Sequence, residues 1–64
     1  MQFQVTGMTC DGCARRVTTA VRKVDAEARV DVDLAHGTVA VTSTAEAAEI
    51  AQAITAAGYP ARAA

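Results

Sequence analysis

Residues 7–24 of the chain read GMTCDGCARRVTTAVRKV, a loop with two glycines that runs into a helical pattern. Apolar side chains recur there at helical spacing, at Ala14, Val17, Ala20, Val21 and Val24. The positions between them are charged or polar, so the segment predicts an amphipathic helix that begins near Gly12 or Cys13. Before the loop, residues 2–6 alternate between polar and apolar side chains, which indicates a half-buried strand that ends at Gly7.

The rest of the chain continues with strands and one more helix. Residues 29–42 predict a β-hairpin around the turn Ala35-His36-Gly37, because apolar and polar side chains alternate on both sides of it. Residues 43–46, which read STAE, fit a capping box for a second helix that ends at Gly58. Tyr59-Pro60-Ala61 predicts a short last strand at a sheet edge, since proline cannot donate a hydrogen bond to a neighbouring strand.

This order of elements predicts an α+β fold of the ferredoxin-like βαββαβ type. Right-handed crossovers place two helices on one face of a four-stranded antiparallel sheet. No linker or repeat interrupts residues 1–64, so we expect a single domain whose last residues, Ala63 and Ala64, are frayed. The expected core consists of Phe3, Val5, Met8, Val17, Val21, Val24, Val30, Val32, Leu34, Val39, Val41, Ile50 and Ile54.

Composition argues against several classes of function. The formal net charge is −1, and the chain has one Tyr and one Phe, so nucleic-acid binding is disfavoured. No apolar run approaches the roughly 20 residues of a membrane span, so direct membrane insertion is not expected. The first residues enter a strand pattern without the features of a signal peptide. We therefore expect a cytoplasmic protein with reduced cysteines.

Both cysteines of the chain, Cys10 and Cys13, lie at the start of the first predicted helix. The partial positive charge of a helix N-terminus stabilises a thiolate, and Arg15 and Arg16 act in the same direction, so we expect a lowered pKa for Cys13. Thiolates favour Cu(I), with Zn(II) as a competitor. The one histidine, His36, is expected at the opposite end of the domain, so a single chain cannot close a four-ligand zinc site. An open two-thiolate site suits Cu(I) or Hg(II) better.

Two uses of this cysteine pair without a metal stay open at this point. The thiols can form a structural disulfide, or they can act as a thioredoxin-like redox centre. A thioredoxin-like pair usually follows a central strand of a longer α/β chain, whereas this chain is short. The metal-binding interpretation is therefore favoured.

The sequence resembles the heavy-metal-associated domain family over essentially its whole length. The residues that carry the resemblance are Gly7-Met8-Thr9-Cys10-Asp11-Gly12-Cys13-Ala14, the Val30-Val32-Leu34 strand and the closing Gly58-Tyr59. This family includes small copper chaperones and the N-terminal modules of metal-transporting ATPases. A bare pair of cysteines two residues apart is a weak signal, but the motif within this order of elements is a specific one.

The resemblance implies a role for each residue of the loop. Cys10 and Cys13 would ligate the metal, while Met8 would pack into the core and anchor the loop. Tyr59 would lie beside the metal loop and tune its exposure. Gly7 and Gly12 would provide the loop geometry.

Two positions depart from patterns within the family and bear on the choice of metal. Thr9 stands where relatives that handle zinc, cadmium or lead often have an acidic residue, which favours Cu(I) over Zn(II). Asp11 and Gly12 stand between the cysteines, where many bacterial copper chaperones carry a histidine. Asp11 adds negative charge near the thiolates and is also a candidate helix N-cap. Mercury-handling members have very similar motifs, so the choice between Cu(I) and Hg(II) stays open.

The resemblance also implies a partner and a mechanism. A basic strip on the first helix would dock onto an acidic face of the partner; it consists of Arg15, Arg16, Arg22 and Lys23. The implied function is that of a non-enzymatic, cytoplasmic Cu(I) chaperone that passes copper to the metal-binding domain of a copper-exporting P-type ATPase by ligand exchange. The alternatives are a Hg(II)-binding module and an excised N-terminal domain of such an ATPase. A metal-bridged homodimer, with Zn(II) binding in vitro, is also open.

Overall fold

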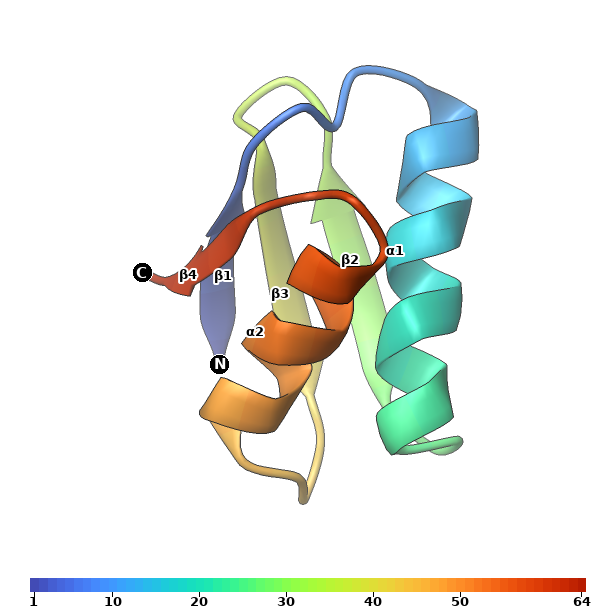
Figure 1. The fold of residues 1–64 in the computed structure, drawn as a ribbon, viewed down its shortest axis with the longest axis vertical. Coiled ribbons are helices and arrows are strands. Elements are labelled where there is room, and N and C mark those ends of the chain that lie inside the picture. Colours follow the sequence, from blue (N-terminus) through green and yellow to red (C-terminus); the bar gives the residue numbers. More distant parts are fainter.

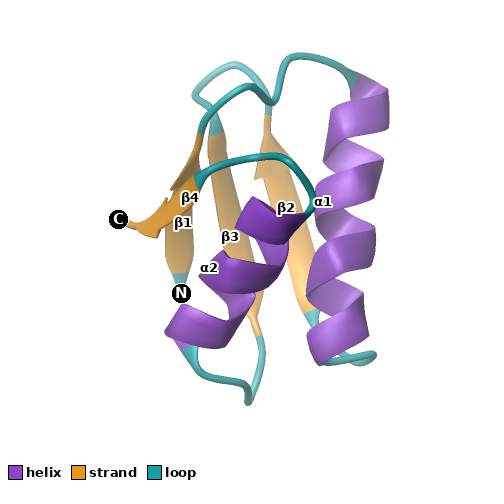
Figure 2. Cartoon of the chain, viewed as in Figure 1, coloured by secondary structure: helices purple, strands orange, loops and turns teal.

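The computed structural model describes all residues of the sequence, 1–64, and contains the predicted elements in the predicted order (Figure 1). The elements are β1 (Gln2–Val5), α1 (Asp11–Val24), β2 (Arg29–Asp33), β3 (Thr38–Thr42), α2 (Ala47–Ala56) and β4 (Ala61–Ala63). The strands form one antiparallel sheet in the order β2-β3-β1-β4, and both helices cover the same face of it (Figure 2). The predicted ferredoxin-like α+β fold is confirmed. Neither helix is long and apolar enough to cross a membrane.

The register of the strands explains the alternation seen in the sequence. Phe3 of β1 pairs with Val39 of β3, and both side chains are fully buried beneath the helices. Gln2 and Gln4 alternate with the buried residues of β1 and are exposed. Successive side chains of a strand point to opposite faces, so one face of the sheet carries the core and the other is open and polar.

The core is one continuous cluster between the sheet and the two helices. Most of the predicted core residues belong to it or pack against it, and Ala28 and Tyr59 join it as well. Val24 was expected in the core, but this prediction is wrong, because Val24 is 37% exposed. Val24 is the last residue of α1, where the chain leaves the helix.

The predicted capping box at residues 43–46 is wrong. Glu46 is the N-cap of α2, and no side chain caps this helix by a hydrogen bond. The Ser43 hydroxyl instead donates to Asp25 Oδ2 at 2.7 Å and accepts from the Ala45 N–H at 3.0 Å. Asp25 also accepts the Glu27 N–H at 3.0 Å through Oδ1. The Asp25 carboxylate therefore joins the α1–β2 connection to the β3–α2 connection.

The last strand lies at a sheet edge, as predicted, but it begins later and includes residues expected to fray. Ala63 pairs with Phe3, and the Ala64 N–H donates to the Gln2 carbonyl at 2.9 Å. Pro60 precedes the strand, and its carbonyl accepts the Thr6 N–H at 2.9 Å. The C-terminal residues are thus ordered by pairing with β1, and the predicted fraying is wrong.

Candidate metal centre

Cys10 and Cys13 lie together at the N-terminus of α1. Cys10 is the N-cap residue, and its sulfur accepts the N–H of Cys13 at 3.4 Å. The two Sγ atoms are 3.1 Å apart and both thiols are free. Cys10 is exposed and Cys13 is half-buried, so the pair opens to solvent. Two sulfur ligands are therefore adjacent, and a further ligand from outside can reach them.

The N-cap prediction for Asp11 is wrong, because Cys10 occupies that position. Asp11 is the first residue of α1 and is exposed. Its carboxylate there complements the partial positive charge of the helix N-terminus. A sulfur takes the place of the oxygen that usually caps a helix, so the same Cys10 atom caps α1 and is available to a metal.

The pKa of the Cys13 thiol is lowered from 9.0 to about 7. The largest cause is hydrogen bonding with the Tyr59 side chain, followed by the Cys10 side chain and the Thr9 backbone. Desolvation opposes this shift. The direction of the shift agrees with the prediction, but neither neighbouring arginine is among its causes. The strongest contribution comes from a residue far away in the sequence.

Tyr59, which affects the pKa of Cys13, lies in the connection between α2 and β4. Gly58, with a φ of +102°, turns the chain there in a conformation that favours glycine. Tyr59 is 8% exposed and belongs to the core cluster against which Cys13 packs. Hydrogen bonding with the Cys13 side chain, together with burial, raises the pKa of Tyr59.

The loop before α1 is anchored by a buried methionine. Met8 is 3% exposed and lies in the core cluster, which fits a packing role rather than a ligand role. Gly7 has a φ of +83°, so a side chain there would be strained. Gly12 does not have a positive φ. A Cβ added there would meet only Cys10 Sγ at 3.8 Å, which is an ordinary contact. Thr9 is exposed between the anchor and the cysteines.

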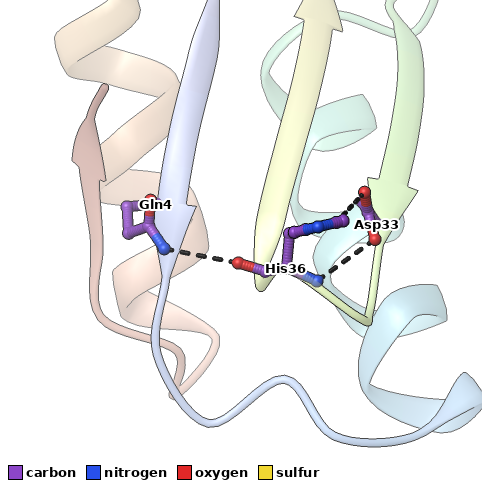
Figure 3. Close-up of polar contacts among 3 residues, drawn as sticks. All are labelled: Gln4, Asp33 and His36. Carbon is purple, nitrogen blue, oxygen red and sulfur yellow. Dashed lines mark hydrogen bonds and ion pairs between the residues drawn. The ribbon is translucent and has the colours of Figure 1, made fainter.

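The expected position of His36 is wrong. The β2–β3 turn that contains it lies at the same end of the domain as the loop before α1 (Figure 1), and the Val5 N–H donates to the Gly37 carbonyl at 2.8 Å. The reason is the topology: β1 ends where its antiparallel neighbour β3 begins. Figure 3 shows His36 bonded to Asp33, on the sheet face away from the helices, with Nδ1 and Oδ2 2.8 Å apart.

Although His36 lies at the same end of the domain as the cysteines, it is not placed to bind a metal together with them. No group of three or more His, Cys, Asp or Glu side chains is placed to hold one metal ion. His36 is held elsewhere, because its backbone N–H donates to Asp33 Oδ1 at 3.2 Å and its carbonyl accepts from Gln4 Nε2 at 3.4 Å (Figure 3). A single chain therefore offers no set of four ligands for zinc. The reason is that His36 is bonded elsewhere, and not that it lies at the opposite end of the domain.

The four basic residues predicted for docking are all exposed on α1. A groove of about 400 Å³ runs between α1 and the end of α2, and the basic residues that line it are Arg15, Arg16 and Lys23. Ala56 and Ala57 form its other side. Arg22 is exposed and does not line this groove. Three of the four residues predicted for docking thus line one groove, which runs along α1 from its first turns to its last turn.

Comparison with known proteins places these features in a family. The model of the heavy-metal-associated domain matches residues 2–60. The chain belongs to the heavy-metal-associated domain family. Among solved structures of similar fold, the copper chaperone Atx1 from Synechocystis PCC6803 (Cu2 form) has a TM-score of 0.92 and 37% identity, covering 97% of this chain and 98% of that one. A gold binding protein has a TM-score of 0.91 and 42% identity, covering 97% and 95% of the two chains.

A relative of this heavy-metal-associated domain is part of a much larger protein. Copper-transporting ATPase 1 of Rhizobium meliloti (strain 1021) is 42% identical over 63 residues. That match covers 95% of this chain but only 8% of the ATPase. The family fold therefore occurs both as a chaperone the size of this chain and as a small part of a transporter.

Proposed function

We propose that this heavy-metal-associated domain is a Cu(I) carrier that holds the ion between Cys10 Sγ and Cys13 Sγ. The observation that carries the proposal is a pair of free thiols, 3.1 Å apart and open to solvent, with no third acidic, histidine or cysteine side chain placed to join them. Soft thiolate ligands and a low coordination number suit Cu(I). A structural zinc site needs four protein ligands, which a single chain does not offer here.

The openness of the site supports transfer rather than storage. A thiolate of an acceptor adds to the copper while both cysteines still hold it, and one original Cu–S bond then breaks. No electron is transferred, no free ion is released and no catalytic residue is needed, so we propose a carrier and not an enzyme. Transfer of this kind needs reduced thiols, which places the proposed activity in a reducing compartment such as the cytoplasm.

The proposed acceptor is the metal-binding domain of a copper-transporting P-type ATPase. The similarity to a copper chaperone and to a copper-transporting ATPase supports this choice. Arg15, Arg16 and Lys23, which line the groove along α1, would steer an acidic acceptor toward the domain, since complementary charge mainly raises the rate of encounter. Hg(II) is the alternative cargo, because two thiolates suit it as well.

A second candidate is supported by the match to the ATPase. In that case the domain would be the N-terminal module of a transporter and would receive copper instead of carrying it. The chemistry of the two cysteines is the same in both candidates. The direction of copper transfer and the natural length of the protein separate them.

The proposed function can be tested by mixing the Cu(I)-loaded protein with the metal-binding domain of the Rhizobium meliloti ATPase. We expect copper to reach the acceptor at a rate that increases with acceptor concentration. Charge reversal of Arg15 to Glu should slow this transfer at low salt and leave the affinity measured with a chelator unchanged, because encounter and binding are separate steps. A transfer rate that does not depend on acceptor concentration would show that copper dissociates first, which would rule out the exchange mechanism.

A further inference from the structure

The sheet has two edges, and they differ in how well they are protected against pairing with another chain. β4 forms one edge; it has three residues and follows Pro60 directly, and short strands and proline both discourage such pairing. β2 forms the other edge, with five residues and no proline. Its only strand partner is β3, so the backbone groups along its outer side are free to pair. A further strand can therefore be added at β2.

The side chains of β2 form two rows with different chemistry. Arg29, Asp31 and Asp33 are exposed on the open face of the sheet. Val30 and Val32 alternate with them, are half-buried and pack against the core. Both valines also line a groove of about 440 Å³ between α1 and β2, so part of their apolar surface is open at this edge. A strand added to β2 would meet charges on one face and valines on the other.

The sequence of β2 is complementary to itself when two copies run antiparallel. With Asp31 opposite the second copy's Asp31, all five residues of each strand overlap. Arg29 then lies opposite the second copy's Asp33, and Val30 opposite its Val32, and a two-fold axis repeats both pairs. Opposite charges directly across a strand pair stabilise it, whereas like charges destabilise it. The two Asp31 carboxylates are therefore the one unfavourable pair in this register.

Other registers satisfy the strand less well. A shift by one residue would place charged side chains opposite valines, because neighbouring residues point to opposite faces. A shift by two residues would keep both rows on their faces, but only three residues of each five-residue strand would then overlap. The register centred on Asp31 uses the whole strand.

The Asp33 carboxylate is already oriented for this pairing. Its Oδ1 accepts the His36 N–H at 3.2 Å, and its Oδ2 lies 2.8 Å from His36 Nδ1, on the open face of the sheet (Figure 3). The Asp33 side chain is still 49% exposed. A carboxylate has about four acceptor sites, so Asp33 can accept from the second copy's Arg29 and keep both contacts with His36.

We propose that β2 is an interface with a second copy of this chain, in which two sheets join edge to edge in the antiparallel register centred on Asp31. The complementarity of the strand with itself selects a second copy over an unrelated strand. One short strand from each copy buries little surface, and the Asp31 pair opposes the contact, so the association is weak and reversible.

This association differs from the sharing of a metal ion between two copies. The β2–β3 turn, where β2 ends, lies at the same end of the domain as the loop that contains Cys10 (Figure 1). In an antiparallel strand pair the cysteine loops of the two copies therefore lie at opposite ends, and both metal sites stay open. The interface needs neither copper nor thiols, so its test is independent of the proposed function.

The experiment is sedimentation equilibrium of the reduced, metal-free protein from micromolar to millimolar concentration. We expect a reversible equilibrium between monomer and dimer. Asp31→Asn removes the like-charge pair and should lower the dissociation constant of the dimer, by up to about fivefold for one cross-strand pair. The matched control is Glu49→Gln, which makes the same change in net charge at an exposed position of α2.

A charge reversal tests the outer pairs of the same register. Arg29→Glu turns two favourable pairs into unfavourable ones and should raise the dissociation constant on the order of tenfold. Arg62→Glu is its control, because Arg62 is exposed in β4 at the opposite edge of the sheet. Circular dichroism verifies that each variant is folded.

The inference is overturned if Asp31→Asn stays monomeric at millimolar concentration or associates no better than Glu49→Gln. It is also overturned if Arg29→Glu associates as well as Arg62→Glu. Loss of the dimer in the Cys10→Ser, Cys13→Ser double variant would show that thiols or a metal join the copies, which contradicts an interface at β2.

Hydrogen exchange locates the interface. The backbone N–H groups of β2 should exchange more slowly at high protein concentration than at low concentration, whereas those of β4 should not change. Slower exchange confined to β4 or to the loop before α1 would place the contact elsewhere and overturn the inference.

Discussion

The Cys10 sulfur combines a structural role with a proposed metal-binding role. It caps α1 by accepting the Cys13 N–H, and the same sulfur is a proposed metal ligand. A thiolate sulfur has more than one lone pair, so it can accept this N–H and bind a metal at the same time. The exposed position of Cys10 allows its side chain to rotate toward a metal without disturbing the core.

The lowered pKa of Cys13 predicts a specific pH dependence. Because the pKa is about 7, the thiolate forms as the pH rises through neutrality, and alkylation of Cys13 by iodoacetamide should rise with a midpoint near that value. Protons compete with a metal below the midpoint, so apparent Cu(I) affinity should fall there. Mass mapping of alkylated Cys13 measures the midpoint. Tyr59→Phe should move it upward, and an identical midpoint in both proteins would contradict the assigned cause.

Met8 should matter for stability and not for metal binding. It is 3% exposed in the core cluster, and truncation of a buried methionine to alanine costs about 2–5 kcal/mol. Met8→Ala should therefore lower the free energy of unfolding measured with urea. Met8→Leu keeps the volume and is the matched control; it should retain both stability and one Cu(I) per site. A Met8→Leu variant that binds copper much more weakly would show that the thioether is a ligand.

At the scale of elements, a single carboxylate connects two loops at the end of the domain away from the cysteines. The pKa of Asp25 is lowered, chiefly by the hydrogen bond from the Ser43 hydroxyl. A carboxyl with a lowered pKa in the folded state stabilises the fold above its unfolded pKa, and this contribution is lost as the pH falls through the folded pKa. The charged Asp25 thus favours the folded state at neutral pH and not in strong acid.

Ser43→Ala should lower the thermal unfolding midpoint at neutral pH and reduce the difference between neutral and acidic solution. Thr44→Ala is the control, because the backbone N–H of Thr44, and not its side chain, donates to Asp25 Oδ2 at 3.4 Å. Thermal unfolding followed by circular dichroism compares the two variants. Equal midpoints for Ser43→Ala and Thr44→Ala at neutral pH would contradict the role given to the Ser43 hydroxyl.

The elements themselves could be predicted from the sequence because each rests on local periodicity. The alternation in residues 2–6 and 29–42 and the helical spacing after Ala14 were sufficient for the fold. The capping box failed because Ser43 bonds to Asp25, 18 residues away, instead of to its own helix. The influence of Tyr59 on the pKa of Cys13 likewise had no local signal, and only the family resemblance pointed to Tyr59. The position of His36 was predicted wrongly for a different reason. The β2–β3 turn lies beside the end of β1 because β1 and β3 are antiparallel neighbours, and this pairing has no local signal in the sequence.

At the scale of the whole molecule, the small size of the domain and its exposed site belong together. A chain of 64 residues encloses one thin core. The N-terminus of α1, where the cysteines are, lies at one end of the domain (Figure 1). Such a site can meet the same site of another protein face to face. Two copies of this chain could therefore share one metal ion through four thiolates, which would also permit Zn(II) binding in vitro.

The central claim is that one Cu(I) is held by the two cysteine sulfurs. The most direct test is a Cu(I) titration of the reduced protein against a competing chelator, with native mass spectrometry to count the bound ions. We predict one tightly bound Cu(I) per chain, or per pair of chains, and loss of tight binding in Cys10→Ser and in Cys13→Ser while the fold persists. Wild-type affinity in either single variant, or no tight binding in the unmodified protein, would contradict the account.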